Sequence, residues 1–390
     1  MDVKPFPLFK LPDVPRSLVF KQFEIHELVT LSMNFRRVRR FATAYKSHEA
    51  ELTWEFNDYY RRSRMTAGRY TRPWNTYMSV FLHFPKMKKK KKNVKYHFLS
   101  GTLRSIEPIK VVNVGGEWPL PIEAYDKKYE YTILGRNDFH KADPRRIDMK
   151  FMEKLSILFE DIFRARKYNV RLLQMREFNL AGSFIWKTLK VFENITISDQ
   201  KISYKTTRFF LEELKVRHLI LDVETTCSRN KPLTLKYPQI DISNCNYATI
   251  EDVMNCSSEK LSIEFKSVVS MDQLVEVVNV WISATKLNGM KKINLEWPER
   301  KNQSNATNEF FKKMEGVGEK IPNETNKITV KRATDGEIAT VEFNGCFFSM
   351  TLQKADDEED EEYEEYEDDE EDEEDEDDDE DEEDEEEEED

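Results

Sequence analysis

A long run of carboxylates confines the folded part of this 390-residue chain to the residues that precede it. From Asp356 to Asp390 every residue is Asp or Glu except Tyr363 and Tyr366. Such a segment repels itself and has no apolar face, so we expect 353–390 to be a disordered acidic tail. Removing its 33 carboxylates from the 75 acidic residues leaves 42 against 60 basic ones, a net charge of +18. The chain is therefore a basic body joined to an acidic tail.

The rest of the composition excludes several classes of protein. No stretch approaches the roughly 20 apolar residues of a membrane span, and the proline-rich first thirty residues lack the apolar core of a secretory signal. No C-x-x-C spacing joins the four cysteines, which are Cys227, Cys245, Cys256 and Cys346. A disulfide framework and a zinc site are therefore not predicted. We expect a cytoplasmic and/or nuclear protein with reduced thiols and no membrane contact.

The sequence also lacks the arrangements that carry catalysis. Glycine is scarce, at 11 residues, and there is neither a glycine-rich phosphate loop nor a Gly-x-Ser-x-Gly elbow. The six histidines are scattered, and the cysteines lie in or beside apolar segments, which is typical of buried structural thiols. We therefore predict a non-catalytic protein with no catalytic residues, no metal site and no cofactor.

Residues 1–48 are predicted to form a small unit of three short helices. Asp13 and Pro15 suit the start of the first helix. The expected inward residues are Leu18, Val19 and Phe23, then Ile25, Leu28, Val29 and Leu31, then Phe35, Val38, Phe41 and Tyr45, with Arg36, Arg37, Arg39 and Arg40 outward. About forty residues make a poor core on their own. Two interpretations follow: a cap packed on the body, or a docking module completed by a partner.

Residues 49–147 carry a weaker pattern, interpreted as a connecting α+β segment. Two strands are predicted, over 75–84 and 94–103, with the basic loop 86–95 between them. This loop contains Lys88, Lys89, Lys90, Lys91 and Lys92, whose mutual repulsion indicates a solvated loop. It suits a hairpin tip, a nuclear-import signal or a polyanion contact, and the sequence leaves these open.

Residues 148–352 show strands that recur along the chain. After an amphipathic helix over 148–167, alternating apolar residues predict strands over 218–222, 239–243, 260–265 and 292–297. Their equivalent apolar positions, Leu219, Ile240, Leu261 and Ile293, are 21, 21 and 32 residues apart. The first two spacings fall in the leucine-rich-repeat range.

Helices fit the gaps between these strands. Thr249 suits the cap of a helix over 250–255, and Ser270-x-x-Gln273 is a capping box for a helix over 271–284. Alternating strands and helices predict a parallel sheet with helices packed on it. The expected fold class is thus mixed α+β / α/β, with a leucine-rich-repeat-like strand–helix domain after the three-helix unit.

An antiparallel β-meander is predicted to close this domain. Asp335-Gly336 and Asn344-Gly345 both favour two-residue type I′ turns. With such turns, Val341 lies opposite both Val330 and Phe348, and Ala339 lies opposite Met350. One face of the meander is then apolar.

Several of these segments resemble a known family. Phe6-Pro-Leu-Phe-Lys-Leu-Pro12, Leu18-Val-Phe and Glu27-Leu-Val-Thr-Leu-Ser32 resemble an F-box of the nematode-expanded type. Asn279-Val-Trp281-Ile, the recurring strands and the segment Ile328–Val341 are similar to the F-box-associated type 2 domain that accompanies it. The two resemblances cover roughly 6–46 and 180–352, and Asn34-Phe-Arg-Arg37 departs from the family's Cys-Ser-Lys-Lys-like stretch.

The resemblance implies a substrate-recognition adaptor of a cullin-based, SCF-type ubiquitin ligase. The F-box would bind a Skp-type linker protein and through it the cullin scaffold, and the associated domain would hold an unknown protein substrate. The positions that match the family's linker-binding pattern are Leu11, Pro12, Leu18, Val19, Phe23, Leu28, Leu31 and Ser32.

A basic body with a polyacidic tail also fits another class of protein. A nucleic-acid- or histone-associated chaperone would bind polyanions through 86–95 and the Arg36–Arg40 helix face. Nucleic acid is therefore retained as an alternative partner, and the two hypotheses are not exclusive.

Overall fold

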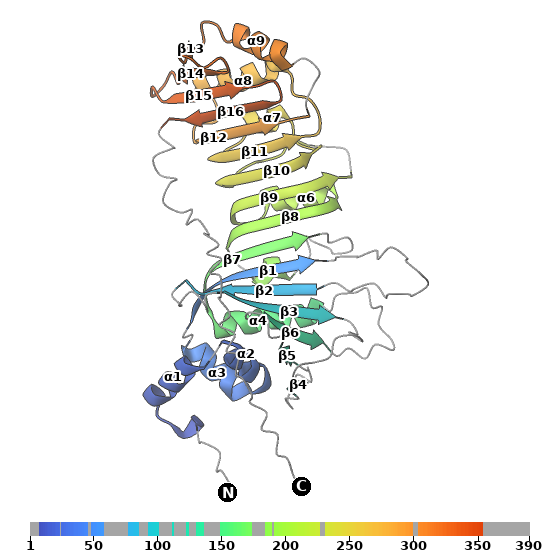
Figure 1. Ribbon diagram of the computed structural model, residues 1–390, viewed down its shortest axis with the longest axis vertical. Helices are drawn as coiled ribbons and strands as arrows, with labels where there is room; N and C mark the ends of the chain where they lie inside the picture. Colours follow the sequence, from blue (N-terminus) through green and yellow to red (C-terminus); the bar gives the residue numbers. More distant parts are fainter. Residues whose placement is uncertain are drawn as a thin grey trace, which may run out of the picture. The chain divides into compact units, whose positions relative to one another are not determined.

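The protein is described here by a computed structural model (Figure 1). The described residues are 8–23, 25–45, 48–57, 77–85, 93–100, 111–112, 122–124, 130–135, 149–173, 184–188, 191–226, 231–298 and 303–353. Lys88–Lys92 and residues 354–390 lie outside them, so the lysines of the predicted basic loop and the predicted acidic tail are not addressed by this structure. The end of that predicted loop, residues 93–95, lies in a strand instead.

After the N-terminal helices, helices and strands largely alternate over residues 149–313, with runs of strands before and after this region. The helices are η1 (Leu8–Lys10), α1 (Asp13–Gln22), α2 (Ile25–Asn34), α3 (Arg36–Tyr45), α4 (Met149–Ile162), α5 (Ile185–Thr188), α6 (Tyr204–Glu212), α7 (Ile250–Met254), α8 (Met271–Ile282) and α9 (Gln303–Lys313). The strands are β1 (Glu49–Asn57), β2 (Tyr77–His83), β3 (Asn93–Ser100), β4 (Val111–Val112), β5 (Ile122–Ala124), β6 (Glu130–Gly135), β7 (Arg164–Leu173), β8 (Phe192–Ile202), β9 (Val216–Thr225), β10 (Gln239–Cys245), β11 (Lys260–Phe265), β12 (Lys292–Glu296), β13 (Glu319–Lys320), β14 (Lys327–Lys331), β15 (Ile338–Phe343) and β16 (Phe347–Leu352). The fold is thus mixed α+β, as expected.

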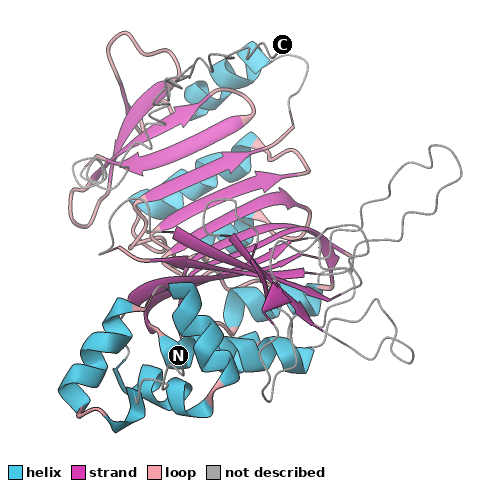
Figure 2. Cartoon of the chain, turned by 60° about the horizontal axis from the view of Figure 1, so that its bottom comes forward, coloured by secondary structure: helices cyan, strands magenta, loops and turns pink. Residues whose placement is uncertain are grey.

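All the described strands join one sheet, in the order β13-β14-β15-β16-β12-β11-β10-β9-β8-β7-β1-β2-β3-β6-β5-β4. Strands β7 to β12 run parallel, and β12 to β16 form the antiparallel end. Figure 2 shows the helices of this region on one face of the sheet. The alternation of side chains along each strand places the apolar residues under those helices and leaves a second, polar face.

The recurring strands predicted from apolar spacing are parallel neighbours. Leu219, Ile240, Leu261 and Ile293 lie side by side in the register of β9, β10, β11 and β12. All four side chains are buried. Even the 32-residue step therefore keeps the register, because the longer helix α8 takes up the extra residues.

Two capping interactions fix the helices between these strands. Ser270 Oγ accepts from the Gln273 N–H at 3.3 Å, and the Gln273 side chain accepts from the Ser270 N–H at 3.2 Å, so the predicted capping box is confirmed. At α7, the buried Asp252 carboxylate accepts from the Thr249 N–H at 2.9 Å and from the Leu233 N–H at 2.8 Å. Asp252 therefore ties the start of α7 to the preceding loop.

The meander forms, but both predicted turns are displaced. Val341 lies opposite Ile328 and Met350, rather than opposite Val330 and Phe348. Ala339 lies opposite Leu352 rather than Met350. Each register therefore differs by two residues from the prediction. Because side chains alternate with a period of two, the same apolar face is still buried.

The positions of the two hairpin loops explain these shifts in register. The first hairpin closes with Arg332 opposite Glu337, which makes the loop four residues long instead of two. In the second, Asn344 N–H donates to Phe347 O, so Gly345 and Cys346 are the central residues. Gly345 has a φ of 93°, which suits the first central position of a type II′ turn.

The first strand is placed where the sequence did not predict it. β1 lies between β2, which is antiparallel to it, and β7, which is parallel to it. Residues 49–147 and 148–352 therefore share a sheet, and the compact unit runs to Gln353. The helix predicted to reach Lys167 ends at Ile162, because Arg164 N–H donates to His48 O and starts β7 beside β1.

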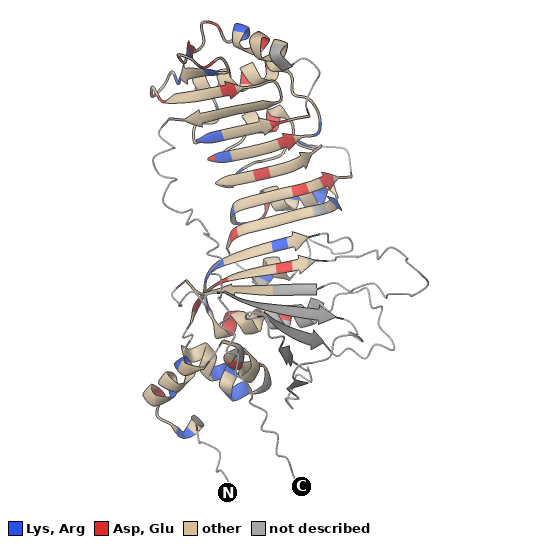
Figure 3. Ribbon diagram, viewed as in Figure 1, with Lys and Arg blue, Asp and Glu red and all other residues tan. Residues whose placement is uncertain are grey.

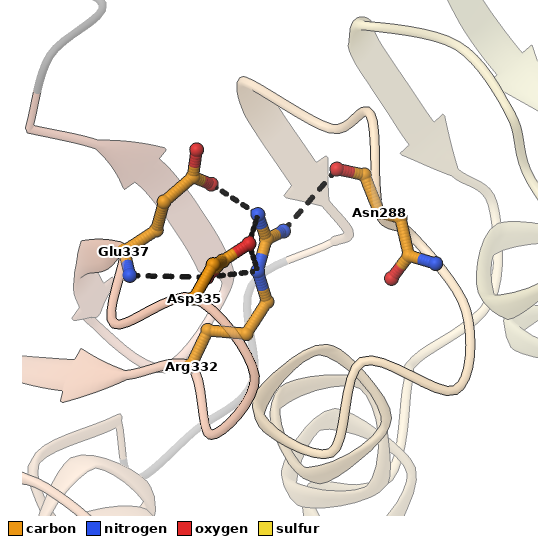
Figure 4. A network of polar contacts seen from close by, with 4 residues as sticks. All are labelled: Asn288, Arg332, Asp335 and Glu337. Carbon is orange, nitrogen blue, oxygen red and sulfur yellow. Dashed lines mark hydrogen bonds and ion pairs between the residues drawn. The ribbon is translucent and has the colours of Figure 1, made fainter.

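A buried arginine holds the first meander loop against the rest of the sheet (Figure 4). Arg332 is 4% exposed, and its guanidinium lies over the Trp281 ring, 5.2 Å from the centroid. It donates to both carboxylate oxygens of Asp335 (shortest distance 2.6 Å), to Glu337, and to Asn288 O at 3.2 Å. The Arg332 side chain therefore links the β14–β15 loop to the Trp281 ring on α8 and to the loop before β12.

We expect this arginine to make stability depend on pH on the acid side. Hydrogen bonds from Arg332 lower the pKa of Asp335 to about 2, below the ordinary value near 3.9. Because the pKa is lower in the folded chain, the contribution is fully present above about pH 4 and is lost as the pH falls towards 2. In thermal unfolding scans, wild type should lose more stability across this window than Asp335→Asn, which does not titrate. Parallel curves would contradict the assignment.

Candidate protein-interaction surfaces

The first three helices are packed on the body as a cap. Phe20, Leu28, Val38 and Ala42 are buried in the same core as the residues of α4. The α2 and α3 helices both contact α4, and Arg39 on α3 donates to Asp161 on α4 at 2.6 Å. The interpretation of residues 1–48 as a cap is therefore supported, and Arg39, predicted to point outward, is half-buried in this ion pair.

The predicted linker-binding residues divide into three groups by exposure. Leu28 and Ser32 are buried, and Pro12 and Leu18 are exposed. The half-buried residues are Leu11, Val19, Phe23 and Leu31. The buried aromatic of α1 is Phe20, which the sequence analysis did not single out. The run Leu18-Val-Phe offers three consecutive apolar residues, and only packing decides which of them turns inward.

An aromatic cluster fixes the outer side of this unit. Phe41 on α3 stacks on Phe9, with ring centroids 5.5 Å apart, and lies 6.0 Å from Phe20. The Arg16 guanidinium lies over the same ring, 4.3 Å from its centroid. Tyr45 OH donates to Asp13 O at 3.3 Å. These contacts hold η1 and α1 against α3.

With α1 held in this way, one of its sides presents apolar residues to solvent. Val14 is 71% exposed and Leu18 is 55% exposed, and their i, i+4 spacing places them on one helix face. Phe35, predicted to point inward, is 47% exposed at the junction of α2 and α3. Exposed apolar residues at helical spacing are typical of a surface that meets another protein.

The polar face of the sheet is a second open surface. Asn169 accepts from Asn194 Nδ2 at 3.0 Å and donates to Thr53 at 3.2 Å, which links β1, β7 and β8. On the next two strands, His218 Nε2 of β9 lies 2.5 Å from Asp241 Oδ2 of β10. Figure 3 marks the charged residues along the strands, with basic residues at one end of β11 and β12 and acidic residues at the other.

Cys245 and Cys256 have the character of packed core residues. Burial raises the pKa of the Cys245 thiol to about 11 and raises that of Cys256. Cys346 is half-buried in the second meander turn, and Cys227 lies outside the described residues. Within the described part of the chain, no group of three or more His, Cys, Asp and Glu could hold a metal ion. No described helix is long and apolar enough to cross a membrane.

Comparison with family models, curated proteins and solved structures finds no match for this chain.

Proposed function

We propose that the chain is a non-catalytic adaptor of an SCF-type ubiquitin ligase, in which α1–α3 bind a Skp-type linker and the sheet-and-helix body holds a protein substrate. The observation that supports this most directly is the exposed apolar side of α1, formed by Val14 and Leu18. These side chains lie on a unit that is itself anchored to the body through α4, so a partner bound there is held rigidly relative to the body.

The buried residues among the predicted linker-binding positions have a structural role in this proposal. Leu28 and Ser32 build the cap, so replacing them would disturb its packing before it reported on binding. Half-buried Leu11 and Leu31 would extend the contact around the exposed pair. A stable interface of this kind buries about 1,600 Å² in total, and a few anchors carry most of its energy.

Replacing Val14 and Leu18 together by glutamate is expected to weaken binding to a Skp-type linker by about 2–4 kcal/mol. Each charge would have to be buried against the linker's apolar groove, whereas in the free chain both positions face solvent and the fold is retained. Titration calorimetry of the purified linker with the full chain measures the loss.

The matched control is Val191→Glu with Ile338→Glu, which places the same charges at exposed apolar positions of the body. This control should bind the linker as wild type does. Equal affinity of the Val14 and Leu18 variant and wild type would reject α1 as the docking surface, as would failure of the wild-type chain to bind.

One observation favours the second hypothesis, a polyanion-binding protein. Arg36, Arg37 and Arg40 are exposed on α3. The two hypotheses differ in salt dependence, because polyanion binding through three arginines weakens steeply with salt, whereas binding through apolar anchors hardly changes. Repeating the linker titration and a nucleic-acid titration at two salt concentrations separates them.

A further inference from the structure

His48 joins the N-terminal helices to the sheet. It lies between α3, which ends at Tyr45, and β1, which begins at Glu49. Its carbonyl oxygen accepts from the Arg164 N–H at 3.0 Å, and this bond starts β7 beside β1. Its ring packs on that of Phe84, directly after β2, with the two centroids 6.3 Å apart. The residue therefore contacts the chain at the ends of both strands that flank β1.

Phe84 connects this ring to the support of the N-terminal helices. It is buried, and its ring lies 5.6 Å from that of Phe163, the residue that follows α4. Phe163 in turn stacks on Phe159 of α4, with centroids 6.0 Å apart. Helix α4 contacts α2 and α3 as well as β7 (Figure 1). The His48 ring thus lies at the end of an aromatic row that packs α4, and with it α2 and α3, against the sheet.

The environment of the ring favours a neutral imidazole. Its Nε2 atom is buried and has no hydrogen-bond partner among the described residues. A neutral imidazole can leave one ring nitrogen without a proton, whereas a protonated one carries an N–H on both. Protonation in place would therefore bury a charged donor with no acceptor, which costs more than burying a neutral group. Burial accordingly lowers the pKa of His48.

The described charges around His48 do not offset a proton on its ring. The described charged and titratable side chains within three residues of these contacts are Tyr45, Glu49, Glu51, His83, Glu160, Asp161, Arg164, Arg166 and Lys167. Glu49 binds Arg166 at 2.9 Å, and Asp161 binds Arg39 at 2.6 Å. Burial is the cause of the lowered pKa of His48, with no contribution from a carboxylate.

We propose that the N-terminal helices are held on the sheet by a pH-sensitive contact, the His48 ring against Phe84, and are loosened when this ring is protonated. The neutral ring keeps its place above about pH 6.5, the ordinary pKa of histidine. Because the pKa is lower in the folded chain, the stabilising contribution of the contact is lost as the pH falls below this value. The protonated ring becomes solvated by leaving Phe84, which frees the start of β1 and the helices before it. This inference concerns how α1–α3 are held and does not depend on the proposed adaptor function.

Hydrogen exchange of the full chain at pH 7.5 and pH 5.5, followed by mass spectrometry, tests the proposal. Protection factors are compared, because the chemical exchange rate itself changes with pH. At pH 5.5 a solvated histidine is protonated about tenfold more often than not, so opening of α1–α3 is favoured by up to that factor. We expect protection in α1–α3 to fall by about fivefold to tenfold, while protection in β9–β12 stays within about twofold.

Two variants remove the titration at this position. His48→Phe keeps an aromatic ring against Phe84 and should give α1–α3 the same protection at both pH values. His48→Gln is neutral and polar, so it should lower protection equally at both. The matched controls are His26→Gln, at the other histidine of the N-terminal helices, and His218→Gln, on β9. Both controls should retain the wild-type loss of protection at pH 5.5.

Equal protection of α1–α3 at the two pH values in wild type would overturn the proposal, as would a loss shared equally by β9–β12. A loss at pH 5.5 that persists in His48→Phe and His48→Gln, or that either control abolishes, would also overturn it. Each His48 variant removes the titration by itself, so one that folds is sufficient.

Discussion

Replacing Trp281 by alanine is expected to lower the free energy of unfolding by about 3–5 kcal/mol. The indole is completely buried on α8, and the guanidinium of Arg332 lies over its ring, so the substitution leaves a cavity in the core. The loss combines the transfer energy of the ring, the cavity and the cation–π contact. Denaturant unfolding with linear extrapolation measures the change.

Asn279→Ala is the matched control for this experiment. It lies on the same helix but is exposed, so its expected effect is within about 0.5 kcal/mol. A loss below about 1 kcal/mol for Trp281→Ala would contradict the packing described for α8.

Arg332→Met is expected to cost about 2–4 kcal/mol. Methionine keeps the aliphatic length of the side chain but loses the hydrogen bonds to Asp335, Glu337 and Asn288 O, as well as the contact with Trp281. Arg332→Lys should recover only part of the loss, because an ammonium group cannot bind a carboxylate with two parallel N–H groups. The same unfolding experiment gives both values.

Lys331, the residue before Arg332, offers a matched control at the end of β14. Lys331→Met removes an exposed charge from β14 and should leave stability nearly unchanged. Combining Arg332→Met with Trp281→Ala should cost less than the sum of the two, since both remove the same contact. Strict additivity would show that the guanidinium and the indole do not interact.

The interior of the parallel region was largely predictable from the sequence. The alternation around Leu219, Ile240, Leu261 and Ile293 predicts strands, and the capping box at Ser270 predicts the start of α8. These are local signals, because a buried strand needs apolar residues at every second position and a helix needs its first N–H groups satisfied. The structure confirms both.

The turns and the candidate interaction surfaces were predictable only in part. Asn344-Gly345 correctly marked a hairpin, but the glycine took the first central position instead of the second. In α1 the apolar run indicated a helix, but not that Phe20 would turn inward and leave Leu18 exposed. In each case neighbouring positions satisfy the local rule almost equally well, so packing makes the choice.

The sequence by itself determined which strand residues face the protein interior and where α7 and α8 begin. It also determined that a basic body is joined to the acidic segment 356–390. Only the tertiary structure decided that β1 lies beside β7, that α2 and α3 rest on α4, and that the charges of β11 and β12 line up as two rows of opposite sign. Periodicity and capping act within a few residues of one another. Pairing between segments more than a hundred residues apart depends on which surfaces are left to cover once every local element has formed.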